Sequence, residues 1–504
     1  LGDYGRRSVS ASVTERMGTA AEGAFAFGAT RQNGFLYNTT TGERIDRRDT
    51  LTGLARFHFR PAHHFELRLL AHAWRSHDGE QPMVPLGGPW FTVARDHTGQ
   101  TQVEAANVGL TAAYRADWGQ LRSTTSLNYW RIGPYLSVLN FGPVELLNDV
   151  RLRLRQINEE LQAEGDLGAS VHWTAGGCFS AGTTRGAFSR VLAPMGLEVE
   201  GSTYEITAQQ AAAFAQATVT LAPGLRLEAG LRGEAVGKEL QRQEVFPTTA
   251  RFQRNSDSTA LLPKLALTQD LSRTLQWYAS LGAGYKPGGF SAFTGHAALA
   301  AFGPERTRTL ESGLTHHTLD QKWQGTVRTF WYEITGYQIE RSFATGAATD
   351  DYLVVNAPKA RSLGAEVELQ WHPVAGLDLG AHLGLTQVTL RDFRDPYTGI
   401  TYNGKRAPFV PALDAGARLA YRHASGLFIG ADASLTGRVY YTEGEAQAFA
   451  QRAYTLVNAR LGYAHGDWSV QCAVENLTDR RYYRSITAGT GHASPGAPRT
   501  YAVE

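Results

Sequence analysis

The sequence is poor in cysteine, methionine and lysine, and it contains no long apolar run. Its 504 residues include 2 cysteines and 3 methionines, and only six of the 49 Lys+Arg residues are lysine. Cys178 and Cys472 lie in unrelated contexts, which argues against a disulfide framework or a cysteine-rich metal site and leaves open whether the two pair. No segment approaches the ~20 apolar residues that a membrane helix needs. The formal net charge of +2 gives no reason to expect a nucleic-acid partner.

The motifs of common hydrolases and metalloenzymes are missing too. G-x-S-x-G, H-E-x-x-H and C-x-x-C do not occur. Two histidine pairs, His63 with His64 and His316 with His317, stand beside expected turns. Neighbouring strand residues point to opposite faces, and an isolated pair lacks a full ligand set. We therefore expect exposed turn histidines, no metal site, no cofactor and no enzyme.

Glycine, by contrast, is abundant, with 54 residues, and the run YASLGAGYKPGGFS at 278–291 is as dense as a phosphate-binding loop. The dinucleotide fingerprint needs a third glycine that opens a helix, and Pro287 stands in its place. Residues before it alternate with a period of two, which predicts a strand that ends in a loop. The near P-loop GITYNGKR at 399–406 lacks Ser or Thr after its lysine, and Pro408 and Pro411 follow. It is therefore predicted to be a loop.

Alternation with a period of two appears along most of the chain. In LRLEAGLRGEA, the apolar set Leu225, Leu227 and Leu231 opposes Arg226 and Arg232. In GAEVELQW, Val367 and Leu369 oppose Glu366 and Glu368 in the same way. Half-buried strands give this pattern, and so do strands with lipid on one side and water on the other.

Short and long connections between these strands alternate along the chain, as in a transmembrane β-barrel with tight turns at one rim and long loops at the other. We expect the short ones, such as 222–224 and 372–376, at one rim. The long polar segments expected at the other rim are 33–49, 76–103, 176–210, 237–257, 286–304, 338–356 and 392–409. The fold predicted is all-β: one large antiparallel transmembrane β-barrel over 1–504, with about 21 strands visible and about 22 in the full protein. The ends of the sequence suggest that a first strand precedes residue 1.

Several segments resemble the barrel of the TonB-dependent outer-membrane receptors, and they occur in that family's order. YASLGAGYKPGGFS is similar to its "Yas...Gyk.GGf" strand and loop, and FGPERTRTLESGLT to its "PE....yE.G.k" strand. NAPKARSLGAEVELQWHPVAGL resembles "n....rs.G.E.e....p..gl". The closing AYTLVNARLGYAHGDWSVQCAVENLTDRRYY resembles "y.lvnarlgy....w.v.l.v.NLfD..Yy".

The resemblance implies an outer-membrane receptor that takes up a scarce nutrient, with a ferric siderophore as the leading cargo. It also implies energy from TonB acting through an N-terminal plug, which this sequence does not contain, and contact with outer-membrane lipids. Another cargo, such as a cobalamin or an oligosaccharide, and a passive plugless porin remain alternatives.

Aromatic and cationic loop residues are the candidates for cargo contact. They are Trp90, Arg95, Tyr285 and Phe290. Aromatic faces and a guanidinium fork suit a bulky anionic chelate. The alternative is that these aromatics belong to the interfacial girdle or pack within their own loops.

Overall fold

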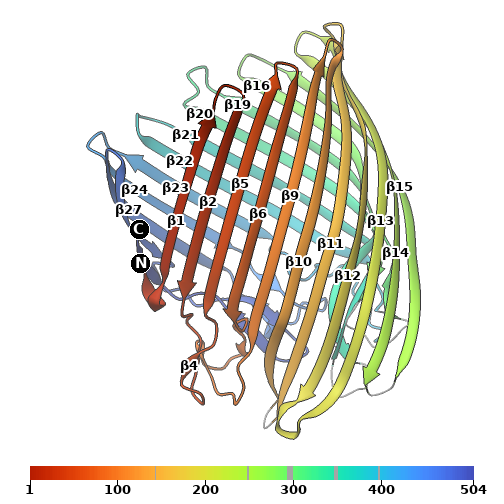
Figure 1. The fold of residues 1–504 in the computed structure, drawn as a ribbon, viewed down its shortest axis with the longest axis vertical. Coiled ribbons are helices and arrows are strands. Elements are labelled where there is room, and N and C mark those ends of the chain that lie inside the picture. Colours follow the sequence, from red (N-terminus) through yellow and green to blue (C-terminus); the bar gives the residue numbers. More distant parts are fainter. Residues whose placement is uncertain (142–143, 247–248, 292–298, 345–349, 396–397) are drawn as a thin grey trace.

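A computed structural model describes residues 1–141, 144–246, 249–291, 299–344, 350–395 and 398–504. Twenty-one strands form one sheet in which sequence neighbours pair antiparallel, confirming the predicted fold and strand number. Figure 1 shows the sheet rolled into a tall, tilted barrel. Its strands are β1 Arg7–Met17, β2 Ala21–Gln32, β5 Arg48–Ala62, β6 Phe65–Gly79, β9 Gln100–Ala116, β10 Gly119–Phe141, β11 Val144–Leu167, β12 Val171–Leu192, β13 Leu197–Ala222, β14 Leu225–Phe246, β15 Ala250–Asp270, β16 Leu275–Lys286, β19 Glu305–His317, β20 Trp323–Ala344, β21 Asp350–Trp371, β22 Leu377–Asp392, β23 Leu413–Arg422, β24 Leu427–Thr436, β27 Tyr454–His465, β28 Trp468–Glu475 and β31 Thr500–Val503.

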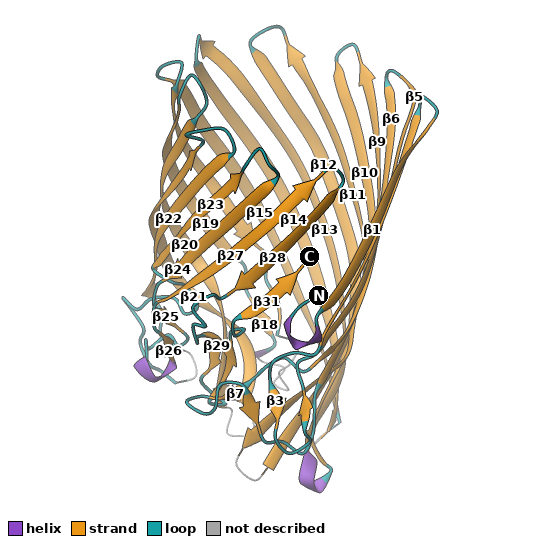
Figure 2. Cartoon of the chain, turned by 90° about the vertical axis from the view of Figure 1, so that its left-hand side faces the viewer, coloured by secondary structure: helices purple, strands orange, loops and turns teal. Residues whose placement is uncertain are grey.

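The sheet closes where the two chain ends meet. The Leu1 ammonium donates to the Val503 carbonyl at 2.8 Å. Gly2 forms antiparallel bridges with both Ala502 and Arg6. The N and C labels of Figures 1 and 2 accordingly lie side by side.

The two faces of the wall differ as the alternation predicts. Leu231 and Leu369 are 49% and 38% exposed, although both are apolar. One apolar row crosses five neighbouring strands: Leu265, Leu281, Leu310, Trp331 and Leu363. A water-filled lumen would not be lined by such rows, so this face is the lipid-facing exterior.

Ion pairs between strands cover the opposite, inward face. Arg226 pairs with Asp270 at 3.2 Å, and Arg328 pairs with Glu366 at 3.2 Å and Glu368 at 2.7 Å. The predicted inward positions are confirmed. The cysteines are free: the Cys178 sulfur accepts from inward-facing Arg232, whereas Cys472 stands opposite the exposed Leu461.

The short connections gather at one rim, here called the turn rim, and the long ones at the other, the loop rim (Figure 1). Gly224 and Gly376 in the predicted turns have φ of 77° and 81°, which a side chain would disfavour. At the loop rim the described parts of the irregular connections carry ten further strands, each of two to five residues. They are β3 Tyr37–Asn38, β4 Glu43–Arg44, β7 Val84–Pro85, β8 Thr92–Val93, β17 Gly289–Phe290, β18 Ala301–Phe302, β25 Val439–Tyr440, β26 Ala450–Gln451, β29 Tyr483–Thr487 and β30 His492–Pro495. The described residues also include the short 3₁₀ helices η1 Asp3–Gly5, η2 Ala193–Met195 and η4 Gln447–Phe449.

Three predicted loops are wrong. Segments 176–210, 237–257 and 338–356 lie largely in strands, so several hairpins stand far above the apolar belt. β12 and β13 stay paired from Val171 opposite Val219 to Leu192 opposite Leu197. Above the belt both faces of a strand meet water, so its composition resembles that of a loop. The sequence pattern did not predict two further long connections, which the structure shows at 437–453 and 476–499.

The glycine-rich segment is the predicted strand and loop. β16 ends at Lys286, and β17 follows at Gly289. A Cβ on Gly288 would lie 2.6 Å from the Phe302 carbonyl, so close packing requires glycine there. The segment 399–406 contains no helix, as predicted. No helix in the described part of the chain is long and apolar enough to cross a bilayer.

Candidate functional site: a collar of loops at the rim

Four connections at the loop rim form a continuous structure, which we call the loop collar: 33–47, 80–99, 437–453 and 476–499. β3 pairs antiparallel with β4 and parallel with β8, and β7 pairs with β30. Figure 2 shows these short strands crowded at the loop rim. The collar therefore joins segments from opposite ends of the sequence.

Two small apolar clusters hold the collar together. The first is formed by Leu36, Ile45, Val84 and Val93, and the second by Val439, Tyr441, Ile486 and Ala493. Tyr483 packs against both clusters. All eight side chains are at least 92% buried, so each cluster has the character of a small hydrophobic core.

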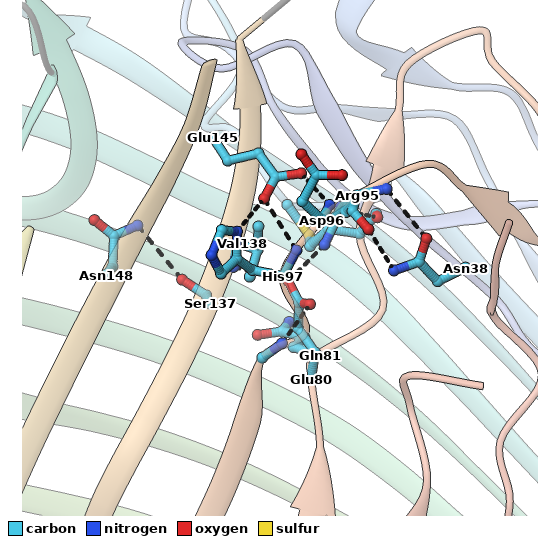
Figure 3. A network of polar contacts seen from close by, with 12 residues as sticks. Asn38, Glu80, Gln81, Arg95, Asp96, His97, Ser137, Val138, Glu145 and Asn148 are labelled. Carbon is cyan, nitrogen blue, oxygen red and sulfur yellow. Dashed lines mark hydrogen bonds and ion pairs between the residues drawn. The ribbon is translucent and has the colours of Figure 1, made fainter. Parts of the chain in front are cut away.

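Arg95 lies inside the collar rather than on its surface (Figure 3). Its side chain is 1% exposed and donates to Glu80 Oε1 at 2.7 Å. A second guanidinium nitrogen donates to the Met83 carbonyl at 2.6 Å, and Asn38 bonds both the backbone N–H and the carbonyl of Arg95. Arg95 thus joins loop 80–99 to loop 33–47.

Glu80 anchors the same network to the barrel wall. It accepts from the Gly99 N–H at 3.1 Å and from the Val138 N–H of β10 at 2.9 Å. Burial raises the pKa of the Glu80 carboxyl, and the adjacent Arg95 partly offsets that rise. Arg95 and the two backbone N–H groups therefore favour the charged form of this carboxyl, whereas burial opposes it.

Glu145 makes a second anchor beside it, on β11 (Figure 3). It accepts from the backbone N–H groups of Asp96 and His97 at 2.7 and 3.1 Å. The His97 ring lies 2.8 Å from the same carboxylate. Two carboxylates thus fix the orientation of loop 80–99 on the wall.

The structure places the four predicted contact residues in three different environments. Trp90 and Arg95 belong to the collar, where the Trp90 ring stacks on Tyr483 with centroids 4.2 Å apart. Tyr285 lies under the Arg306 guanidinium, 5.8 Å from its ring centre, and bonds Ser258. Phe290 packs against a separate cluster of Tyr204, Leu240 and Ala300.

The collar also borders a cavity that the sequence did not indicate. Its volume is about 420 Å³, and its lining includes Tyr337, Phe409, Tyr441 and Glu443. Three aromatic rings from three separate loops or strands meet there. An aromatic residue in a polar loop, such as Phe409 after Pro408, was the available signal, but only the fold brings the three together.

Nothing in the described part of the chain groups three or more His, Cys, Asp or Glu side chains in a way that could hold a metal. The paired histidines instead border aromatic rings at the turn rim. His64 meets Tyr114 with centroids 5.4 Å apart, and His316 meets Trp323 at 5.1 Å. Aromatic rings at this level are typical of a membrane interface.

Comparison with known proteins agrees with this architecture. The model of the TonB dependent receptor-like beta-barrel matches residues 18–477. The chain belongs to this family. Its members and the similar solved structures are TonB-dependent transport receptors, not enzymes.

Among sequence relatives, the pesticin receptor of Yersinia enterocolitica is 26% identical over 266 residues. The match covers 50% of this chain and 36% of that receptor, so it spans little more than a third of the relative's length. The pesticin receptor of Yersinia pestis is 25% identical over the same length.

Solved structures show the same barrel. The ferric yersiniabactin uptake receptor FyuA from Yersinia pestis has a TM-score of 0.87 at 18% identity, covering 100% of this chain and 78% of that one. The siderophore receptor PiuA from Acinetobacter baumannii has a TM-score of 0.84 at 14% identity, covering 100% and 79%. At these identities the likeness establishes the fold.

Proposed function

We propose that this TonB-dependent barrel is the outer-membrane part of an importer for a ferric siderophore, driven by TonB. The observation that carries the proposal is the cavity of about 420 Å³ at the loop rim, whose lining combines the aromatic residues Tyr337, Phe409 and Tyr441 with polar residues, among them Glu340 and Glu443. Small-ligand sites have volumes of about 300–1,000 Å³ and combine apolar and aromatic groups with a smaller number of polar ones that orient the ligand. Flat rings also suit the planar arms of a siderophore. The cargoes named for FyuA and PiuA support this choice.

Trp90, Arg95, Tyr285 and Phe290 are proposed to contribute to cargo binding. Arg95 would act through Glu80 by holding loop 80–99 in place, because its guanidinium is buried. Trp90 would act through its stack on Tyr483, which joins loops 80–99 and 476–499. The ordered collar then presents a preformed face to the cargo, which lowers the entropy cost of binding.

Uptake and binding of radiolabelled ferric siderophores by cells that carry the whole receptor test the proposal. Tyr441→Ala and Arg95→Ala are each expected to weaken binding by about 1–3 kcal/mol. Trp468→Ala, on a residue 83% exposed at the turn rim, is the matched control and should leave binding unchanged.

Dependence on TonB separates an importer from a pore. Uptake should stop when TonB is deleted or the proton gradient is collapsed. Uptake that continues would identify a passive porin, and saturable uptake of cobalamin or an oligosaccharide without any siderophore would reassign the cargo.

A further inference from the structure

The outward face of β10, β11 and β12 carries an unusual concentration of arginine. On this face Leu127, Ile157 and Phe179 are exposed apolar residues of the belt. The next outward positions toward the loop rim on β11 are Arg155 and Arg153, both exposed. These three strands lie side by side in the front wall of Figure 1.

A single row of directly opposed residues across neighbouring strands shows why this concentration of arginine is unusual. From β6 to β13, directly opposed residues are Arg75, Glu104, Arg131, Arg153, Arg185 and Glu205. Arg131 pairs with Glu104 at 3.6 Å and Arg185 with Glu205 at 2.5 Å. Arg153 in the middle has an arginine on each side.

Arg153 and Arg155 make no ion pair or hydrogen bond with any residue that the structure describes. Directly opposed Cβ atoms in a sheet are about 4.5–5.5 Å apart, and like charges in such positions repel. Two of the arginines are compensated by glutamate, but the central one and its neighbour Arg155 are not. Repulsion between these arginines therefore raises the free energy of the folded protein, and a bound anion would remove that repulsion.

The position of the arginine row along the barrel axis, relative to the hydrocarbon layer of the membrane, indicates which anions can reach it. Trp118 and Trp173 stack at the turn rim, and Trp173 stands opposite Gly165 on β11. Ten residues separate Gly165 from Arg155, and at about 3.3 Å per residue and a tilt of about 40° they span about 25 Å. Arg155 therefore marks the loop-side edge of the hydrocarbon layer, and Arg153 and Arg131 lie among the lipid headgroups.

The same surface is hollowed next to Arg185. An open depression of about 730 Å³ has a lining that includes Arg185, Glu205, Gln241, Gln243, Arg251 and Gln253. Arg251 there donates to Gln243 at 3.2 Å. A lipid headgroup that extends beyond the arginine row would thus contact amide groups and a second guanidinium, which can form hydrogen bonds with sugar hydroxyl groups.

We propose that Arg131, Arg153, Arg155 and Arg185 bind the phosphate groups of a phosphorylated glycolipid in the outer leaflet of the membrane. Guanidinium forks bind phosphate oxygens in pairs, and charge-assisted hydrogen bonds of this kind are the strong ones. Clusters of arginine at a membrane surface recognise anionic headgroups. The far wall differs: its outward row alternates in charge, with Glu333 between Arg308 and Arg361.

The inference rests on the proposed membrane placement, with the loop rim outside, but not on the cargo. Native mass spectrometry of the detergent-purified protein, titrated with diphosphoryl lipid A or the same lipid without phosphates, tests it. The unmodified protein should prefer the phosphorylated lipid by about tenfold or more. Arg153→Gln with Arg155→Gln should abolish most of that preference.

Arg308→Gln is the matched control, since Arg308 is an exposed outward arginine whose opposite residue is acidic, and it should keep the full preference. Heat-modifiable migration in gels tests whether each variant is folded. If the double variant does not fold, the single variant Arg153→Gln replaces it in the titration. A double variant that binds both lipids as the unmodified protein does would overturn the inference. Siderophore uptake should be unchanged in the double variant, so the two proposals fail separately.

Discussion

Arg95 is a charged side chain that is almost fully removed from solvent, and its partner Glu80 is buried to the same degree. Removing one member of such a pair leaves the other charged and buried, which costs about 3–5 kcal/mol. Arg95→Ala should therefore raise hydrogen exchange in 80–99 sharply, while the barrel still migrates as folded. Barrel strands should keep their protection, because no ladder bond depends on Arg95.

The matched variant removes both charges together. Arg95→Met with Glu80→Gln should restore most of the protection that Arg95→Ala loses, because no uncompensated charge remains in the collar. Exchange in the double variant as fast as in Arg95→Ala would show that the side-chain hydrogen bond to the Met83 carbonyl, rather than the charge pair, maintains the loop.

His492 makes the collar sensitive to pH. Burial lowers the pKa of its imidazole from the ordinary 6.5, nearby Arg95 lowers it further, and a bond to the Thr490 carbonyl partly opposes this. A lowered pKa means that the unfolded collar binds the proton more readily, so His492 stabilises it above pH 6.5 and less as pH falls below that value. We expect weaker protection of 476–499 at pH 5.5 than at pH 7.5, after correction for intrinsic exchange rates.

His492→Asn should flatten this dependence, because the amide can donate to Thr490 without titrating. Glu80 contributes with the opposite sign, since its pKa is raised from 4.5 and its contribution is lost as pH rises. Glu80 is present in both proteins, so the difference between them isolates His492. Equal pH dependence in the two proteins would exclude His492 as the origin.

At the scale of elements, the alternation predicts the strands and their faces because each belt strand touches lipid on one side and water on the other. That contrast ends above the belt, where both faces are wet, and for that reason the sequence predicts loops at 176–210, 237–257 and 338–356, which lie largely in strands. Contacts between loops are harder still to predict from the sequence than the strands. Nothing near Arg95 in the sequence indicates that Glu80 and Asn38 surround it or that Glu80 accepts from the Val138 N–H, since these contacts join loops 80–99 and 33–47 and strand β10.

A substitution at two neighbouring positions of β15 tests the assignment of faces. Leu265 lies in the apolar row and is 46% exposed, whereas Ala266 faces inward opposite Glu228. Leu265→Arg should lower the free energy of unfolding by about 2–4 kcal/mol, as arginine does at the lipid face. Ala266→Arg should cost far less, because its charge meets water and Glu228. Urea titration in lipid vesicles measures both, and similar costs would mean that the register is off by one residue.

At the scale of the whole molecule, the collar depends on contacts between the first hundred residues and the last seventy. Val84 pairs with Ala493, and Trp90 stacks on Tyr483. Barrel closure makes these contacts possible, because it brings β31 beside the start of the chain. Sequence periodicity describes each strand separately, so it predicted the barrel but not which loops meet above it.

The height of the apolar belt leads to a prediction about the membrane itself. Between the ring pair of Trp118 and Trp173 and the level of Arg155, the outward face of β11 spans about 25 Å. A thicker bilayer would draw Arg155 and the polar strand ends above it into hydrocarbon, and a thinner one would leave Ile157 in water. The midpoint of urea unfolding should therefore be highest in phosphatidylcholine vesicles whose hydrocarbon layer is near 25 Å thick, and lower when it is about 5 Å thicker or thinner. Tryptophan fluorescence follows the transition, and Leu265→Arg serves as a control whose midpoint is low at every thickness. A midpoint that rises steadily with thickness would place the upper edge of the belt above Arg155, and the arginine row would then lie within the hydrocarbon rather than at its boundary.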